Sequence, residues 1–307
     1  MHHPYTIYDL IIIGAGPAGL TASIYASRYE LNHLIIGNLV GGTAAIAPMV
    51  HNWPSEKAIS GLELSQKIEE TAKNLGGQIL IDEVIDIKKN GVFSVFTHSN
   101  AELKAKNIIL ALGTIRKKIN LAGEDKFLGH GVSYCATCDG PLFKNKIVAV
   151  LGGSDAAAET GLYLSELASK VYIIYRGEKL RTQEATIEKL INQKNIEIIY
   201  NNNIKELKGD QSLEEIILEN NYQGRQNLKV DGLFIEIGGL PPQNLIEKLK
   251  LETDSAGYIK IKAGCSTNIP GIFAAGDVTT GSNGLKQIIT ACAEGAVAAT
   301  SIYHYLQ

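Results

Sequence analysis

The sequence lacks long apolar runs, a strong excess of charge of one sign, and more than a few cysteines. No apolar run approaches the roughly 18 residues that a membrane-spanning helix requires. The net charge of -3 gives no reason to expect nucleic acid or an anionic membrane as a partner. The first residues also lack the basic-then-apolar order of a signal peptide, so a cytoplasmic protein is expected.

What is present is typical of a globular protein. The chain has 307 residues, of which 45% are hydrophobic and 20% charged, enough to bury a sizeable core in about two domains. Residues 8–36 and 147–174 each read as an apolar strand, a glycine turn, a helix and a second apolar strand. These are βαβ units, which predict an α/β fold with parallel sheets covered by helices.

Later segments repeat the theme. Residues 107–114 and 231–239 are apolar strands that end in glycine, and each follows its own βαβ unit in the same order. The chain therefore reads as two nucleotide-binding domains of similar plan. The stretch from Gly271 to the end has no counterpart in the second unit, so we expect it to complete the first domain.

The first glycine turn contains the G-x-G-x-x-G fingerprint as Gly14, Gly16 and Gly19. In this pattern the first glycine permits a tight turn, the second lets the backbone approach a pyrophosphate, and the third lets helix and strand pack closely. The pattern follows a strand and opens a helix, which favours dinucleotide binding. The usual acidic residue at the end of the next strand is absent. Asn38 stands there instead, either to bond the ribose hydroxyls or only as a turn residue.

The most informative cysteines are Cys135 and Cys138, in a C-x-x-C spacing. Such a pair suits half of a zinc site, a structural disulfide or a redox dithiol. No second pair of ligands stands nearby, and disulfides are rare in reducing compartments, so the redox dithiol is favoured and no metal is expected. Asp139 is a candidate proton carrier or a plain turn residue. Cys265 and Cys292 are read as small buried hydrophobes.

Three segments, residues 14–19, 131–140 and 271–278, together resemble low-molecular-weight thioredoxin reductases. The resemblance covers about residues 8–303. It implies two Rossmann-like three-layer domains, the second inserted into the first. The FAD domain would comprise residues 1–117 and 245–307, and the NAD(P)-binding-like domain with the cysteine pair would comprise residues 118–244. The resemblance also implies a homodimer that reduces thioredoxin or a similar protein.

The resemblance further implies roles for particular residues. Cys138 would exchange electrons with the flavin, and Cys135 would attack the disulfide of the partner protein. The FAD contacts would come from the first glycine turn, the loops that follow the next strands, and the segment that opens the last helix. These residues are Gly14, Ala15, Gly16, Pro17, Ala18, Gly19, Asn38, Gly42, Thr43, Asn52, Ala111, Gly113, Gly276, Asp277, Lys286, Gln287 and Ile288.

The second glycine turn departs from the pattern for NADPH. Ser154 replaces the middle glycine, and the family's His-Arg-Arg at the end of the next strand reads Tyr175-Arg176-Gly177, with Arg181 further on. The arginines would grip the 2′-phosphate of NADPH, or they are only solvated charges. The residues expected at this nicotinamide site are Gly152, Gly153, Ser154, Asp155, Ala156, Tyr175, Arg176, Arg181 and Gly238.

The electron donor therefore stays open between NADPH, NADH and a carrier such as ferredoxin. The predicted function is a flavin-dependent disulfide reductase that works through FAD and the Cys135/Cys138 dithiol. Two alternatives remain: an FAD-dependent dithiol oxidase running in the reverse direction, and a flavin-binding scaffold without turnover.

Overall fold

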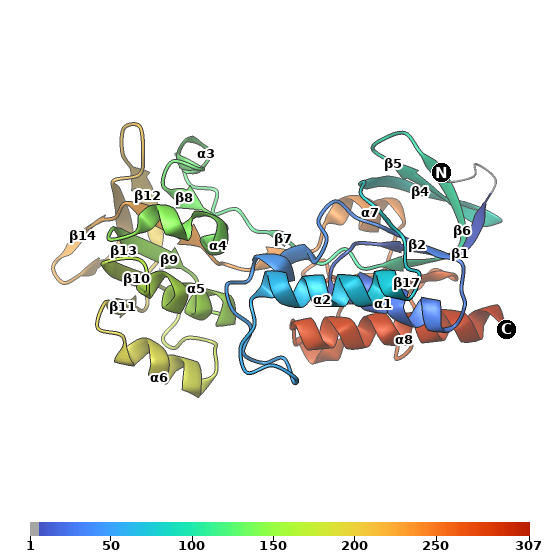
Figure 1. Ribbon diagram of the computed structural model, residues 1–307. Coiled ribbons are helices and arrows are strands. Elements are labelled where there is room, and N and C mark those ends of the chain that lie inside the picture. The colour runs from blue at the N-terminus through green and yellow to red at the C-terminus, as the bar shows by residue number, and fades with distance from the viewer. Residues whose placement is uncertain (1–5) are drawn as a thin grey trace. The chain divides into compact units, whose positions relative to one another are not determined.

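A computed structural model describes residues 6–307 (Figure 1). The chain divides into two compact units. The first contains the described residues up to Ala45, together with residues 50–115 and 240–307, and the second contains residues 46–49 and 116–239. The chain passes between them in strands β7 (Ile115–Arg116) and β16 (Gly239–Leu240), which pair as a two-stranded sheet. Within residues 6–307, no helix is both long and apolar enough to cross a bilayer.

The first unit is built on a seven-stranded sheet. Its central strands run parallel because helical crossovers join them, whereas β4 and β5 form an antiparallel hairpin beside β6. The C-terminal strand β17 pairs in parallel with β6, so the end of the chain completes the sheet that its beginning starts. The strands, in spatial order, are β3 (Ile79–Leu80), β2 (His33–Ile36), β1 (Ile7–Ile13), β6 (Glu102–Leu110), β5 (Val92–Thr97) and β4 (Val84–Asn90), with β17 (Ile272–Ala274) also on β6.

Each face of this sheet has its own core. Strand β1 sends Ile11 and Ile13 to one face and Leu10 and Ile12 to the other, as expected of a strand buried on both sides. One core includes residues of the β4–β5 hairpin and of helix α7, and the other includes residues of α1 and α8. The helices are α1 (Pro17–Arg28), η1 (Gly42–Ile46), α2 (Gly61–Asn74), α7 (Gln243–Lys248), η3 (Ser282–Gly284) and α8 (Ile288–Leu306).

Helices α1 and α8 lie side by side in the first unit (Figure 1). They approach so closely that a Cβ on Gly295 would lie 2.1 Å from the carbonyl oxygen of Ala18. The small residues of both helices permit this approach, and it fixes α8 against the start of α1. The N-terminal half of α8 is thereby held close to the first glycine turn.

The second unit has a five-stranded parallel sheet in the order β11 (Ile196–Ile199), β10 (Lys170–Ile174), β9 (Ile147–Leu151), β15 (Gly232–Ile235), β8 (Val132–Ser133). One face packs against helices α5 and α6, and the other packs against a three-stranded antiparallel sheet. The result is again three layers. The remaining elements are α3 (Glu124–Phe127), α4 (Ala136–Asp139), η2 (Gly140–Phe143), α5 (Asp155–Ser165), α6 (Glu184–Asn192), β12 (Ile204–Lys208), β13 (Glu215–Tyr222) and β14 (Arg225–Lys229).

Candidate active site

The first glycine turn follows β1 directly, and the chain itself requires two of its glycines. Gly14 has a φ of +113°, and a Cβ there would lie 2.1 Å from the carbonyl oxygen of Ala111. A Cβ on Gly19 would lie 1.9 Å from the carbonyl oxygen of Gly14. Both clashes are with main chain, which cannot move aside as a flexible side chain can. These two glycines are therefore needed to build the turn, whatever binds to it.

Gly16, the middle glycine, differs from the other two. Its backbone is extended, with φ −79° and ψ −175°, a conformation that any residue adopts. The nearest described atom to a Cβ at this position would be the Cα of Gly42, 3.8 Å away. Gly42 packs closely against this residue, since a Cβ on Gly42 would lie 3.1 Å from the Cα of Gly16. The two glycines form a cradle of bare backbone at the start of α1, where the first amide groups have no partners inside the helix. This cradle fits the pyrophosphate of FAD.

The other residues predicted for the first turn and its neighbouring loops lie around this cradle. Ala15 and Ala18 are buried and Pro17 is the first residue of α1, whereas Asn38 and Thr43 are exposed. Ala111 and Gly113 follow the end of β6, next to the turn.

The loop that follows β17 is held by a residue that the sequence did not single out. Glu294, on α8, is only 8% exposed. Its Oε2 accepts hydrogen bonds from the amide of Gly276 and from Thr279 Oγ1, both at 2.8 Å. Its Oε1 accepts from Ser282 Oγ at 2.6 Å. Glu294 is the one acidic residue of α8, which is the signal that the sequence offered, and its contacts make it the anchor of the Gly276–Asp277 segment.

The next two predicted flavin residues carry opposite charges. Burial raises the pKa of Asp277; the nearby Lys286 ammonium opposes this shift, and the Glu294 carboxylate adds to it. Burial also lowers the pKa of Lys286. The Lys286 ammonium donates to the carbonyl of Thr279 and lies 4.4 Å from the centroid of the Tyr258 ring.

Two predicted flavin neighbours that are far apart in sequence meet in the first unit. Asn52 Nδ2 donates to Gln287 Oε1 at 2.8 Å. Gln287 is the N-cap of α8, and its backbone amide donates to Thr290 Oγ1 at 3.2 Å in a capping box. Ile288, also predicted, is the first residue of that helix. The cap therefore fixes Gln287, which in turn orients Asn52.

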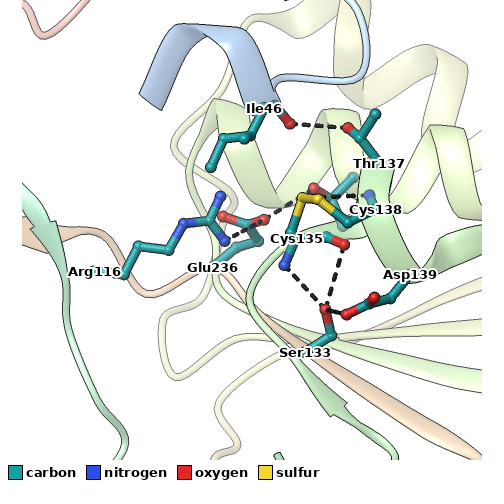
Figure 2. Close-up of a disulfide and its surroundings, with 9 residues drawn as sticks. Ile46, Arg116, Ser133, Cys135, Thr137, Cys138, Asp139 and Glu236 are labelled. Carbon is teal, nitrogen blue, oxygen red and sulfur yellow. Dashed lines mark hydrogen bonds and ion pairs between the residues drawn. A yellow bond between two sulfur atoms is a disulfide. The ribbon is translucent and has the colours of Figure 1, made fainter. Parts of the chain in front are cut away.

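In the second unit, Cys135 and Cys138 form a disulfide at the start of the short helix α4 (Figure 2). Cys135 is the N-cap residue, and its sulfur accepts a hydrogen bond from the amide of Cys138 at 3.3 Å. Cys135 is half-buried and Cys138 is exposed. Thr137, between them, donates at 2.8 Å to the carbonyl of Ile46, which belongs to the second unit. A donor aimed at the Cys135 sulfur would stabilise its thiolate once the disulfide is reduced.

Ser133 connects the cysteine pair to Asp139 (Figure 2). Its hydroxyl donates to Asp139 Oδ2 at 2.6 Å and accepts from the amide of Cys135 at 3.0 Å. Ser133 is the last residue of β8 and is only 3% exposed, so this arrangement is well fixed. Asp139 and Cys135 therefore both hydrogen-bond to the Ser133 hydroxyl, a link that the spacing of the motif did not reveal.

A second charged pair, also drawn in Figure 2, was not predicted. Arg116 Nη1 lies 3.6 Å from Glu236 Oε1, with the two side chains 29% and 12% exposed. Thr160 Oγ1 donates to the same carboxylate oxygen at 3.3 Å. Burial raises the pKa of Glu236, although Arg116 and Thr160 oppose the shift.

The second glycine turn keeps only part of the first turn's construction. Gly152 has a φ of +155°, and a Cβ there would lie 2.3 Å from the carbonyl oxygen of Glu236. Ser154 is the N-cap of α5, with φ −97° and ψ 178°. Asp155, the first residue of α5, accepts from Thr182 Oγ1 at 2.5 Å, and Ala156, which follows it, is exposed.

Tyr175 covers the remaining glycines of this site. Its ring lies where a Cβ on Gly153 or Gly177 would come within 2.3 Å and 2.6 Å. The guanidinium carbon of Arg181 lies 5.9 Å from the ring centroid. Arg176 and Arg181 are both exposed, and so is Gly238, predicted for the same site, which has a φ of +90°. The Tyr175 ring therefore fills the space that a larger side chain at position 177 would need.

Residues 8–295 match the family model described as pyridine nucleotide-disulphide oxidoreductase. The chain belongs to this family. It is 40% identical over 304 residues to the thioredoxin reductase of Bacillus subtilis (strain 168), covering 98% of this chain and 95% of that protein.

Solved structures agree with this assignment. A thioredoxin reductase of Lactococcus lactis, in its FR conformation, gives a TM-score of 0.92 at 36% identity and covers 97% of this chain and 99% of that chain. A ferredoxin-flavin thioredoxin reductase from Clostridium acetobutylicum gives a TM-score of 0.53 at 35% identity, covering 97% and 98%. The predicted α/β fold with two Rossmann-like domains is confirmed, and so is the predicted class of activity, a flavin-dependent disulfide reductase. Membership of the family implies a flavin and a pyridine nucleotide.

Proposed function

We propose that the first unit holds FAD non-covalently and that electrons pass from it to the Cys135–Cys138 disulfide and then to a thioredoxin-like protein. The observation that carries the proposal is the disulfide itself, at the N-cap of α4 and next to Asp139. The cradle of Gly16 and Gly42 supports FAD as the flavin, because FAD carries a pyrophosphate that FMN lacks. FAD, when bound, supplies the electron pair that reduces the disulfide.

The cysteines have separate roles in this proposal. The Cys135 thiolate attacks one sulfur of the partner's disulfide, which breaks that S–S bond and releases one partner thiolate. The Cys138 thiolate then attacks the Cys135 sulfur of the mixed disulfide. This step re-forms the Cys135–Cys138 bond and releases the second partner thiolate. The amide of Cys138, which donates to the Cys135 sulfur, supports Cys135 as the attacking thiolate.

Asp139 is proposed to carry a proton between the dithiol and solvent. Two thiolates leave the partner protein, and both take up protons, so a proton carrier near the sulfurs is needed. The hydroxyl of Ser133 fixes the Asp139 carboxylate while it also binds the amide of Cys135. This shared contact supports a role for Asp139 in the chemistry beyond that of a turn residue.

The donor is proposed to be a pyridine nucleotide bound at the second glycine turn, with NADPH favoured only weakly over NADH. Arg176 and Arg181 remain for a 2′-phosphate, whereas residue 177 is glycine. The ferredoxin-dependent relative keeps ferredoxin as the second candidate.

The resemblance of the sequence to dimeric reductases also leads us to propose a homodimer, which light scattering of the purified protein would test.

One experiment tests the function and the donor together. The purified protein is expected to be yellow, and its flavin absorbance should bleach anaerobically with the physiological donor. NADPH, NADH and reduced ferredoxin are added in turn, followed by an oxidised thioredoxin. Recovery of the absorbance with thioredoxin supports the proposal. A colourless protein that takes up no FAD, or a bleached flavin that thioredoxin cannot reoxidise, would contradict it.

A further inference from the structure

The topology of the second unit indicates where the nicotinamide half of a dinucleotide would lie. Strand β9 lies between β10 and β15 in a parallel sheet, and the helical crossover from β9 leads to β10. The strand order therefore reverses between β9 and β15, and in open α/β sheets ligands bind at the carboxyl ends of the strands at such a point. A pyrophosphate at the glycine turn after β9 would place the adenosine toward Arg176, which follows β10. The other half of the dinucleotide then lies over the end of β15.

Glu236 stands at that end. It directly follows β15, and its carbonyl oxygen is the atom that a Cβ on Gly152 would strike. Its side chain is 12% exposed, so it is largely desolvated but open enough to be reached. Arg116 approaches the same carboxylate from β7. The pair therefore lies at the edge of the sheet where the nicotinamide half of the ligand is expected.

The hydrogen bonding of the pair is incomplete. The 3.6 Å between Arg116 Nη1 and Glu236 Oε1 is an ion pair rather than a hydrogen bond. Arg116 Nη1 is buried, and among residues 6–307 it has no hydrogen-bond acceptor. Leaving a buried charged donor unsatisfied is costly, and such groups in native proteins call for an explanation.

A primary carboxamide complements this arrangement. Its NH₂ group donates and its carbonyl oxygen accepts, while Glu236 accepts and the guanidinium of Arg116, whose side chain is 29% exposed, donates. We propose that Glu236 and Arg116 recognise the carboxamide of the nicotinamide ring, Glu236 through the amide nitrogen and Arg116 through the amide oxygen. The inference rests on the proposed pyridine nucleotide donor and adds to it two specificity residues outside the glycine motif. It holds equally for NADPH and NADH, which share the carboxamide.

Two analogues separate the two contacts. The 3-acetylpyridine analogue of NADP⁺ keeps the carbonyl oxygen and replaces the NH₂ group by a methyl group. The thionicotinamide analogue keeps the NH₂ group and replaces the oxygen by sulfur, a weaker acceptor. Dissociation constants of the oxidised forms are measured by calorimetry on the FAD-loaded protein, because the analogues differ in redox potential and turnover would confuse the comparison. The NAD⁺ series is measured in parallel.

The wild-type protein is expected to bind NADP⁺ at least about tenfold more tightly than either analogue, since each loses a hydrogen bond to a charged group. In Glu236→Ala the preference over the acetyl analogue should fall to about one, while the preference over the thio analogue remains. In Arg116→Ala the pattern should reverse. Glu236→Gln, which keeps an accepting oxygen and is the milder change, should retain part of the acetyl discrimination.

The matched control is Glu197→Ala. It removes the carboxylate of another ion pair of the same unit, with Lys170 at 2.6 Å, which joins β11 to the amino-terminal end of β10. Both preferences should be unchanged in this variant. Equal losses for all three ligands in the Glu236 and Arg116 variants would mean a structural role only and would overturn the inference. So would a wild-type protein that does not distinguish the analogues.

Failure of the donor proposal gives a different result. If no dinucleotide binds the wild-type protein, the carboxamide inference is overturned as well. Chemically reduced protein would then still reduce thioredoxin, so the disulfide reductase function would stand. Failure of that last reaction would instead contradict the proposed function itself.

Discussion

The two glycine turns of this chain occupy the same place in their units but are built to different requirements. Both begin with a glycine at positive φ, Gly14 at +113° and Gly152 at +155°, whose missing Cβ makes room for a carbonyl of a neighbouring strand end. The fold demands this glycine in both. The third position differs, because Gly19 has no room for a Cβ, whereas Ala157 is accommodated as a buried residue of α5.

The middle position of each turn shows the clearest difference, glycine in the first turn and serine in the second. Gly16 and Ser154 both have extended backbone, and both are N-caps of their helices. The chain itself therefore does not require glycine at either position; only a pyrophosphate approaching the turn would. The change to Ser154 should leave folding intact and act only on the ligand. The first turn therefore has glycine where only a bound pyrophosphate would require it, and the second has serine.

The largest effect is expected from substituting the cysteines of the second unit. These substitutions should abolish turnover without changing the second glycine turn. Cys138→Ser should abolish electron transfer between flavin and dithiol, and Cys135→Ser should stop reduction of the partner protein. Turnover with thioredoxin should fall by about a thousandfold or more in each, because the two cysteines act as a unit. Stopped-flow flavin absorbance and thioredoxin reduction measure the two steps. Near-normal turnover in either variant would refute the assigned roles.

The next effect distinguishes structural from ligand-only glycines in the first turn. Gly19→Ala should prevent folding of the first unit, since its Cβ would lie 1.9 Å from a main-chain oxygen. Gly16→Ala should fold normally but bind FAD at least about tenfold more weakly, because the pyrophosphate loses a charge-assisted contact. Circular dichroism and FAD titration of the apoprotein measure both. The distinction fails if Gly16→Ala is unfolded or if Gly19→Ala behaves as wild type.

A smaller effect is expected from rebuilding the second turn. Ser154→Gly should raise kcat/KM for NADPH and NADH alike, because both share the pyrophosphate. Gly177→Arg should favour NADPH alone, by about tenfold for one contact to the 2′-phosphate. The Tyr175 ring occupies the space next to residue 177, so the arginine should be combined with Tyr175→His. Steady-state kinetics with both cofactors give the test, and tight NADPH selectivity in the wild-type protein would show that Arg176 and Arg181 suffice.

The smallest effect concerns the pH dependence of the first unit. Burial raises the pKa of Asp277, so the folded apoprotein holds this proton more tightly than the unfolded chain. Its contribution to stability is therefore present below the unfolded pKa and is lost as the pH rises through the folded pKa. Asp277→Asn should remove this loss and raise the Tm of the apoprotein at neutral pH by no more than about 4 °C. Melting curves from pH 4 to 8, with the exposed Asp210→Asn as control, measure it. A lower Tm in Asp277→Asn at neutral pH would contradict this sign.

Local patterns alone determined much of this protein. The strands, glycine turns and helices of both units follow from hydrophobic periodicity and from the punctuation of glycine, which act over neighbouring residues. The redox pair follows from the spacing of Cys135 and Cys138, because two cysteines three positions apart can close a disulfide at a helix start.

Only the tertiary structure decided which side chains meet. Glu294 reaches Gly276 because α8 packs against α1, and Asn52 meets Gln287 across 235 positions of sequence. The pairing of Glu236 with Arg116 depends on a connecting strand returning to the end of β15. In each of these contacts, the sequence around one residue gives no indication of which distant residue it will meet. Their positions follow from how sheets and helices pack, which is fixed by the burial of the whole core rather than by any short pattern.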